Sequence, residues 1–396
     1  MRVAMIDPSL FTLPYDRALV EGLASAGHDV TLHGRRPEVE DGQAGAIRLE
    51  RDFYRVANSP AMRRAPKPMR LAVKGLDHAV SMLGLLARLR AAAPDIIHFQ
   101  WLPLPAFDQR VLGGFARIAP IVFTVHDTDP FNGDPAAAVQ RLGFARCLAR
   151  FDTLIVHTGQ GQGRLAAQGV LPERIALLPH GALTPRTEAS PDPMDGPLTF
   201  VVFGKMKPYK GIDLLIEAFA ALPALLRDAA RLRIVGKPYM DLAPLREAAD
   251  QLGIADRVEI DPRFVGDDEV GAVFAPGSVA VFPYREIEAS GVLQLAIAQG
   301  RPLIASRLGS FAETIADGEQ GHLTAPGDVA ALTAALRHML EDRAFAAGCA
   351  AAVRRLSDAV PSWTTIGRQT AEVYRRAAAA RAGVASRAAP QEPCHV

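Results

Sequence analysis

Two lysines close to a glycine form the first group of residues that could bind a ligand. Residues 202–211, Val-Phe-Gly-Lys-Met-Lys-Pro-Tyr-Lys-Gly, lie between an expected strand at 199–203 and an expected helix at 212–222. Gly204 lets a ligand approach the backbone closely, and Lys205 and Lys210 supply cationic donors that suit a diphosphate. A solvated basic loop capped by Gly211 is the alternative, and composition alone does not separate the two.

A second group follows the expected strand at 279–282. Residues 283–293 are Pro-Tyr-Arg-Glu-Ile-Glu-Ala-Ser-Gly-Val-Leu, with Ser290 as the expected N-cap of a helix. The helix then begins with Gly291, Val292 and Leu293. Its first backbone amides can hold an anion, so together with the two lysines they predict a diphosphate site. Ordinary capping with no ligand is the alternative.

A histidine ends a strand-like run in the first half of the chain. Residues 122–127, Val-Phe-Thr-Val-His-Asp, place His126 at the carboxyl tip of a buried strand. Ligand-contacting residues of open α/β sheets lie at such tips. A histidine satisfied within a loop is the alternative. His98, Trp101 and His180 also follow strand-like runs, and for these three we favour a structural role.

Positive charge is concentrated in one segment. Residues 51–90 contain nine Lys or Arg against two Asp, a net charge of +7 in a chain whose formal net charge is +1. The first part contains three prolines and is expected to be a loop, and the second is expected to be a helix at 71–92. Such a segment suits an anionic membrane surface or a lipid-diphosphate acceptor, and a solvated face over a core helix is the alternative. The residues singled out are Arg63, Arg64, Lys67 and Arg70.

Strand-like apolar runs alternate with helix-length segments along the whole chain. Val- and Ile-rich runs at 3–6, 30–33, 96–99 and 121–125 are followed, after a Pro-rich stretch, by a second series that starts at 199. Strands that are apolar on both faces are typical of a parallel sheet covered by helices on both sides. We therefore expect an α/β protein with two doubly wound Rossmann-like domains that face a cleft. The expected boundaries are an N-terminal domain at 1–181, a linker at 182–197, a C-terminal domain at 198–360, a helix at 361–380 that packs back toward the N-terminal domain, and a flexible tail at 381–396.

Composition excludes several classes of protein. A net charge of +1 argues against a nucleic-acid-binding surface. Three widely spaced cysteines fit neither a disulfide framework nor a zinc site and indicate a reducing compartment. No export signal and no apolar run of membrane-spanning length is found. We therefore expect a cytoplasmic protein whose contact with a membrane, where it makes one, is peripheral and on the inner face.

Three pieces of the second half together resemble a known family. They are Phe-Gly-Lys-x-x-Pro-Tyr-Lys-Gly, Pro-Tyr-Arg-Glu-x-x-x-Ser-Gly-Val-Leu and Gly-Arg-Pro-Leu-Ile-Ala-Ser, at 203–211, 283–293 and 300–306. In this order and spacing they are similar to the retaining GT-B glycosyltransferases of family 4, also called glycosyltransferase group 1. The resemblance spans nearly the whole chain and is strongest in the second domain.

The resemblance implies roles for several residues. Lys205 and Lys210 would hold the donor diphosphate, with Lys205 in place of the family's more common arginine. The helix N-terminus at Ser290 would face the same diphosphate. His126 and Glu286 would contact the donor sugar. A solvated acidic turn is the alternative for Glu286 and Glu288.

The chain also departs from the family pattern. The glutamate that usually contacts the nucleotide ribose falls on Leu295, which cannot make that contact. Gln294 is its neighbour and points about 100° away on a helix, so ribose recognition is left open. The family's amino-terminal Gly-rich turn is replaced by Asp-Pro-Ser-Leu-Phe at 7–11.

The resemblance implies a hexosyltransferase that retains anomeric configuration, and we expect it to need neither a metal nor a cofactor. His126, Glu286 and Lys210 are the expected catalytic residues. The expected partners are a nucleotide-diphosphate sugar and a saccharide or lipid-linked acceptor, as in the synthesis of cell-surface or exopolysaccharide, with no nucleic acid. A sugar-nucleotide epimerase on the same fold and a catalytically silent nucleotide-sugar-binding partner are the alternatives.

Overall fold

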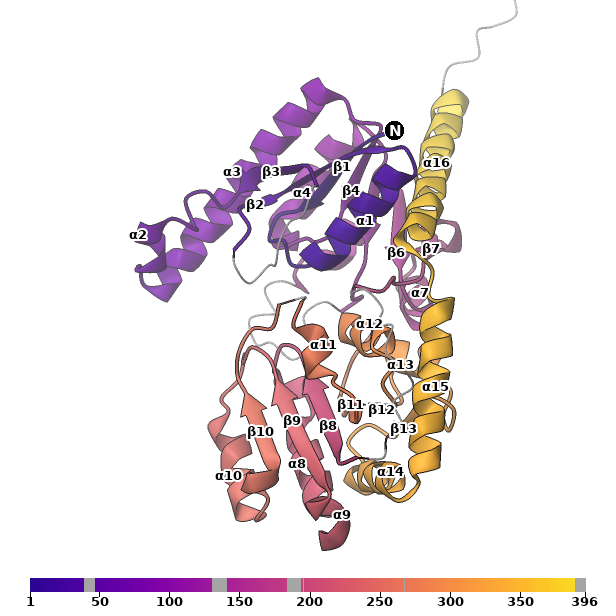
Figure 1. The fold of residues 1–396 in the computed structure, drawn as a ribbon. Coiled ribbons are helices and arrows are strands. Elements are labelled where there is room, and N and C mark those ends of the chain that lie inside the picture. The colour runs from indigo at the N-terminus through magenta and orange to yellow at the C-terminus, as the bar shows by residue number, and fades with distance from the viewer. Residues whose placement is uncertain (39–46, 130–140, 184–193, 195, 267, 389–396) are drawn as a thin grey trace, which may run out of the picture. The chain divides into compact units, whose positions relative to one another are not determined.

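The chain forms two compact units. The computed structural model describes residues 1–38, 47–129, 141–183, 194, 196–266 and 268–388 (Figure 1). The first unit comprises Met1–Pro179 and Ser362–Val396, and the second comprises His180–Pro361. The expected linker at 182–197 falls mostly outside the described residues.

The first unit is built on a seven-stranded sheet in the order β3-β2-β1-β4-β5-β6-β7, and every neighbouring pair is parallel. Its strands are β1 (Arg2–Asp7), β2 (Asp29–Arg35), β3 (Leu49–Phe53), β4 (Ile96–Phe99), β5 (Ile121–Thr124), β6 (Thr153–Val156) and β7 (Ile175–Leu177). Its helices include α1 (Leu13–Ser25), α2 (Pro60–Arg63), α3 (Lys67–Ala92), α4 (Pro105–Ala116), α6 (Phe144–Leu148), α7 (Gly159–Ala167) and α16 (Trp363–Ala388). The strands β4, β5 and β6 are buried along their whole length, as the apolar runs predict.

Helix α16 belongs to the first unit although it follows the second in sequence. It crosses α1 at a glycine of each helix, Gly22 of α1 and Gly367 of α16. A Cβ on Gly22 would lie 2.1 Å from the carbonyl oxygen of Trp363, and a Cβ on Gly367 would lie 2.3 Å from the carbonyl carbon of Gly22. Glycines therefore allow the two backbones to touch. Farther along α16, the hydroxyl of Tyr374 lies 2.7 Å from Nδ1 of His98 in β4.

The second unit contains a six-stranded parallel sheet in the order β10-β9-β8-β11-β12-β13. Its strands are β8 (Leu198–Phe203), β9 (Ala230–Val235), β10 (Val258–Asp261), β11 (Ser278–Phe282), β12 (Leu303–Ser306) and β13 (Gly321–Thr324). Its helices include α8 (Ile212–Ala220), α9 (Ala224–Asp228), α10 (Ala243–Gln251), α11 (Val270–Val273), α12 (Gly291–Ala298), α13 (Gly309–Thr314), α14 (Val329–Glu341) and α15 (Arg343–Ala359). Separate apolar clusters pack on the two faces of this sheet.

The strand orders place the point of reversal between β1 and β4 in the first unit and between β8 and β11 in the second. In doubly wound sheets, ligands bind beyond the carboxyl ends of the strands at such points. A ligand-binding site is therefore expected in the segments that follow β1, β4 and β5 in the first unit, and in those that follow β8 and β11 in the second.

Two segments differ from the sequence expectation. The basic segment, expected to be a loop before residue 71, contains α2, and α3 already begins at Lys67. Pro60 and Pro68 lie in the first turns of these helices, where proline removes no intrahelical hydrogen bond, so their presence did not indicate a loop. Helix α16 continues to Ala388, through an alanine-rich stretch that was expected to be a loose tail after 380.

Candidate active site

Gly204 follows β8 with a φ of +98°, a conformation that other residues rarely adopt. A Cβ there would lie 3.0 Å from Nζ of Lys210 and 3.1 Å from a methyl carbon of Val292. On its other side, a Cβ on Gly236 would meet the carbonyl oxygen of Gly204 at 2.1 Å. The lysine loop after β8 and the start of α12 are thus in contact at this glycine.

Lys210 is buried, with 3% of its surface exposed. Its ammonium donates to the carbonyl oxygen of Phe203 at 2.9 Å and lies 5.2 Å from the centre of the Tyr284 ring. Burial, reinforced by the charges of Lys205 and Lys207, lowers the pKa of Lys210 to about 7. Lys205 itself is exposed. In this loop Lys210 is therefore an immobilised cation, whose charge an anionic ligand would stabilise, whereas Lys205 is exposed to solvent.

The loop after β11 is fastened to the lysine loop by Arg285. Its guanidinium makes two hydrogen bonds to the carboxylate of Asp213, at 2.8 and 2.6 Å, and its amide donates to the carbonyl of Tyr209 at 2.7 Å. A Cβ on Gly211 would lie 2.0 Å from the carbonyl oxygen of Pro283. Sequence reasoning gave Arg285 no role, because its partner is 72 residues away.

Ser290 is the N-cap of α12, as the sequence predicts, and its hydroxyl accepts from the amide of Leu293 at 3.3 Å. The Leu293 side chain lies in the core. Gly291 and Val292 come before the first intrahelical bonds, so their amides are the ones available to an anion. Leu293 is placed as a structural residue behind them.

The two acidic residues before α12 have different surroundings. Glu286, singled out for the donor sugar, is exposed, whereas Glu288 is only 3% exposed. The alternative of a solvated acidic turn therefore describes Glu286 and does not describe Glu288. The carbonyl of Glu288 also accepts from the amide of Ser310 at 2.7 Å, which holds this segment against α13.

Two further polar residues belong to this region, His180 beside the start of α12 and Gln294 within it. Nε2 of His180, which we expected only to turn the chain, lies 4.0 Å from the position of a Cβ on Gly291. Gln294 is 9% exposed, and its Oε1 is buried without a hydrogen-bond partner among the described residues. Leu295 packs against the apolar cluster of this face of the sheet. A buried acceptor without a partner needs an explanation, and a ligand hydroxyl would supply one.

In the first unit, His126 lies just beyond β5 and is half-buried. Its Nε2 is 3.2 Å from Oε1 of Gln100, and its ring meets the Tyr15 ring edge-on at 4.8 Å. Donation to Gln100 places the proton on Nε2 and leaves Nδ1 as the acceptor nitrogen. His98 is fully buried between Tyr374 and Thr124, and burial lowers its pKa to about 3, so its role is structural as expected.

The basic segment lies elsewhere in the first unit. Arg63 ends α2, Arg64 follows it, and Lys67 and Arg70 lie in the first turns of α3. All four side chains are exposed. Figure 1 shows α2 and the start of α3 extending beyond the sheet of this unit. These residues are therefore separate in sequence and position from His126.

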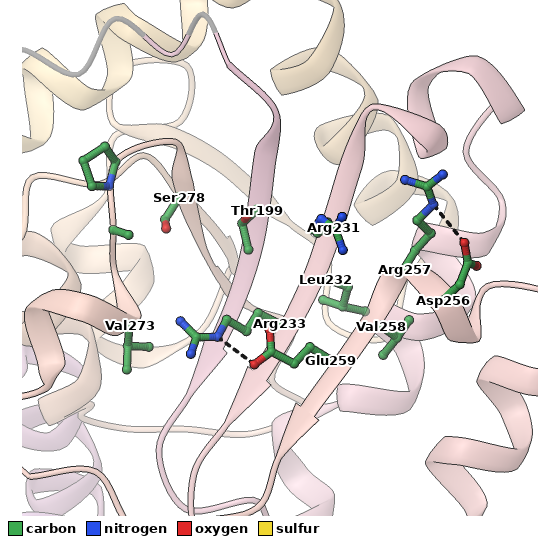
Figure 2. Close-up of a pocket in the computed structure, with 12 residues that line it drawn as sticks. Thr199, Arg231, Leu232, Arg233, Asp256, Arg257, Val258, Glu259, Val273 and Ser278 are labelled. Carbon is green, nitrogen blue, oxygen red and sulfur yellow. Dashed lines mark hydrogen bonds and ion pairs between the residues drawn. The ribbon is translucent and has the colours of Figure 1, made fainter.

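A pocket of about 300 Å³ lies at the opposite, amino-terminal edge of the second sheet, where β8 to β11 begin. Figure 2 shows the residues that line it. Arg233 pairs with Glu259 at 3.3 Å, and Arg257 pairs with Asp256 at 3.2 Å. Ligands of doubly wound sheets bind at the other edge, and Arg233 and Arg257 already have partners. We therefore assign the pocket no substrate. Among the residues that the structure describes, no three His, Cys, Asp or Glu side chains are grouped as metal ligands would be.

Two family models match the chain. The model "Glycosyl transferase 4-like domain" matches residues 14–181, and "Glycosyl transferases group 1" matches residues 197–342. Glycogen synthase of Mycobacterium tuberculosis is 30% identical over 390 residues, which cover 90% of this chain and 88% of that protein. The chain belongs to the group 1 glycosyl transferases. An "MMP alpha-(1->4)-mannosyltransferase" of Mycolicibacterium hassiacum is 27% identical and covers 92% of this chain and 94% of that protein.

Solved structures show the fold of this group 1 glycosyl transferase. Sucrose-phosphate synthase from Thermosynechococcus elongatus superposes with a TM-score of 0.74 at 20% identity, over 96% of this chain and 100% of that chain. WaaG, a glycosyltransferase of lipopolysaccharide biosynthesis, has a TM-score of 0.64 at 18% identity, over 94% of this chain and 99% of that chain. The predicted GT-B architecture, with two Rossmann-like domains, is confirmed. None of the helices in the described part of the chain is long and apolar enough to cross a membrane.

Proposed function

We propose that this glycosyltransferase moves a hexosyl group from a nucleotide-diphosphate donor to an acceptor, with retention of anomeric configuration and without a catalytic metal. One observation carries the proposal: Lys210, Gly204 and the start of α12 come together beyond β8 and β11. This arrangement offers a buried cation, a backbone open to close approach and two helix-terminal amides. These are the groups that a departing diphosphate needs.

The assigned roles follow from the chemistry of transfer. The bond from C1 of the sugar to the diphosphate oxygen breaks, and a bond from C1 to the acceptor oxygen forms on the same face of the ring. The proton of the acceptor hydroxyl passes to the leaving diphosphate. Lys210, Lys205 and the amides of Gly291 and Val292 stabilise the charge that develops on the diphosphate.

The remaining contacts concern the donor's sugar and ribose. We assign His126 and Glu286 to the hydroxyls of the donor sugar. Nδ1 of His126 acts as the acceptor, because Nε2 donates to Gln100. We assign Gln294 to a ribose hydroxyl, since its buried Oε1 can accept one hydrogen bond where Leu295 can accept none.

The relatives support a choice of substrates. Glycogen synthase and the mannosyltransferase that resemble this chain over most of its length indicate a glucosyl or mannosyl donor and a saccharide acceptor. A "GDP-mannose-dependent alpha-(1-6)-phosphatidylinositol monomannoside mannosyltransferase" of Mycolicibacterium smegmatis, 32% identical over 213 residues, favours a lipid-linked saccharide. That match covers 50% of this chain and 55% of that protein, so the acceptor class rests mainly on the basic segment.

The proposal is tested by offering the enzyme several nucleotide-sugar donors and determining the anomeric configuration of the product. Calorimetry with UDP, GDP and ADP identifies the base, and the matching glucose and mannose donors are then offered with saccharide and lipid-linked acceptors. The anomeric proton coupling in the NMR spectrum of the product reports its configuration. Inversion would overturn the retaining mechanism. Epimerised donor would support the epimerase, and nucleotide binding without turnover would support the silent partner.

We further propose that the basic segment attaches the enzyme reversibly to an anionic membrane surface. Arg64, Lys67 and Arg70 make no side-chain hydrogen bond or ion pair within the described parts of the chain, while Arg63 is paired with Glu38 at 3.3 Å. Cations without an intramolecular partner gain most from an external anionic surface. Each such cation contributes about 1 kcal/mol to the free energy of binding near the surface.

Helix α3 adds an apolar stripe to this charge. Met69, Leu76, Val80 and Leu83 follow helical spacing and are between 49% and 68% exposed. The opposite side of the same helix is buried at His78, Met82, Leu85, Leu86 and Leu89. A helix that is apolar on its outer side and flanked by cations is suited to lie in a membrane interface.

A further inference from the structure

Phe11 and Trp101 form a stacked pair in the first unit. Their ring centres are 4.4 Å apart and the rings are inclined by 23°. Phe11 lies in the turn between β1 and α1, and Trp101 lies two residues beyond β4, the strand hydrogen-bonded to β1. Phe11 remains 48% exposed, so part of the stack is open to solvent. The pair thus stands at the carboxyl edge of the sheet, where the strand order reverses.

The turn that carries Phe11 is held in place by buried groups. The carboxylate of Asp7 accepts from the amides of Ser9 and Thr12 at 3.1 and 3.0 Å. Leu10 has a φ of +49°, which is uncommon for a residue with a side chain. Its side chain packs on Gly34, where a Cβ would lie 2.4 Å from one Leu10 methyl carbon. These contacts hold the backbone on both sides of Phe11 in one conformation.

The groups beside the stack are polar. Gln100 precedes Trp101, its amide bonds to the carbonyl of Ile6 at 2.8 Å, and its side chain reaches His126. Sugars present an apolar C–H face and a rim of hydroxyls to their binding sites. An exposed aromatic face close to the half-buried imidazole of His126 matches both parts.

We infer that Phe11, supported from behind by Trp101, is the platform on which a pyranose ring of the acceptor stacks. This inference rests on the proposed function and adds that the acceptor end nearest His126 is a saccharide. The platform provides an apolar contact whose geometry is already set before the acceptor arrives, which lowers the entropy lost on binding.

The first test uses the fluorescence of Trp101. The chain has two tryptophans, so Trp363→Phe leaves Trp101 as the only one. Titration of this variant with maltotetraose or an α-mannotriose should change the emission saturably. Adding Phe11→Ala should raise the half-saturating concentration about tenfold, whereas Phe11→Tyr should not. No response to either sugar would overturn the inference. A response to anionic vesicles alone would also overturn it, in favour of a membrane contact.

The second test separates acceptor binding from donor binding. Phe11→Ala should raise the acceptor KM about tenfold and leave the dissociation constant of the nucleotide unchanged. Leu171→Ala is the matched control, because Leu171 is 54% exposed and lies before β7 at the other edge of the sheet. Unchanged acceptor KM in an active Phe11→Ala enzyme would overturn the platform alone. Failure to bind any nucleotide would overturn the proposed function, while the sugar titration would still decide the platform.

Discussion

The ammonium of Lys210 donates to the carbonyl oxygen of Phe203 at 2.9 Å, from a position that is almost fully buried. Phe203 is the last residue of β8, so the bond holds the cation directly at the carboxyl end of the strand. The strand thereby positions the charge that we assign to the donor diphosphate.

Replacing Lys210 with alanine should therefore reduce transfer strongly. A lost charge-assisted hydrogen bond of about 1.5 to 3 kcal/mol corresponds to roughly 10- to 150-fold in rate. The initial rate of transfer measures this, and circular dichroism checks that the variant is folded. Lys207→Ala is the matched control on the same loop. Wild-type turnover in a folded Lys210→Ala enzyme would remove Lys210 from the site.

The low pKa of Lys210 predicts how donor binding depends on pH. In the free enzyme the ammonium is present below about pH 7 and is lost as the pH rises through that value. Donor affinity should therefore fall above pH 7, by up to about tenfold per pH unit. Calorimetry with the nucleotide diphosphate from pH 6 to 9 measures this fall. Lys210→Met should bind weakly and with a flatter profile, and an equal slope in both proteins would contradict the assignment.

The same pKa has the opposite effect on folding stability. An unfolded lysine holds its proton up to about pH 10.4, whereas native Lys210 releases it near 7, so the unfolded state binds more protons between these values. The contribution of Lys210 to stability should consequently rise with pH across this window. The difference in Tm between wild type and Lys210→Met, followed from pH 6 to 10, measures it. A difference that does not change with pH would show that Lys210 is not held at a low pKa.

Transfer should continue in the presence of EDTA. Lysines and helix-terminal amides neutralise the diphosphate in the proposed mechanism, so no divalent ion is needed. The rate of a protein dialysed against the chelator, with and without added Mg²⁺ or Mn²⁺, measures this. Loss of activity in EDTA with recovery on adding one of these ions would refute the metal-independent mechanism.

Glu286 and Glu288 should differ in what they contribute. Glu286→Gln removes an exposed carboxylate and is expected to lower the transfer rate. Its free energy of unfolding should stay within about 0.5 kcal/mol of the wild type, so Tm should hardly change. Glu288→Gln changes a buried group and is expected to lower Tm. Parallel measurement of rate and Tm separates the two. A Glu288 variant with normal Tm and no transfer would move the donor-sugar role from Glu286 to Glu288.

Charge reversal in the basic segment should abolish membrane binding. The variant carries glutamate at Arg63, Arg64, Lys67 and Arg70, and it should no longer sediment with anionic vesicles, while nucleotide binding is kept. Binding of the wild type should weaken as salt rises, because the Debye length is about 10 Å at 0.1 M. Serine at Leu76, Val80 and Leu83 should weaken binding without this change in salt dependence.

Reversal of Arg231, Arg246 and Arg355, exposed arginines of the second unit, is the matched control and should leave sedimentation unchanged. Uncharged vesicles should hardly bind the wild type. Sedimentation of the basic-segment variant at the wild-type level, or absence of sedimentation by the wild type, would make a soluble acceptor the better proposal.

By itself, the sequence determined the features that depend on near neighbours. Apolar runs predicted β4 at 96–99 to the residue, and Ser290 was recognised as an N-cap because capping depends on residues within one turn. The order of glycines and lysines indicated a diphosphate site because these residues, too, are close together in the sequence. The prolines of the basic segment were misjudged, because a proline suits a loop and a first helical turn equally well.

Only the tertiary structure decided which side chains are buried and which distant ones meet. Lys210 is buried while Lys205 is exposed, and Glu288 is buried while Glu286 is not, although each pair has similar local sequence. Phe11 meets Trp101 because β1 and β4 are neighbours in a sheet whose order is not that of the chain. His98 meets Tyr374 across 276 residues because α16 packs on the first unit. Such contacts depend on the packing of whole elements, and local patterns do not contain that information.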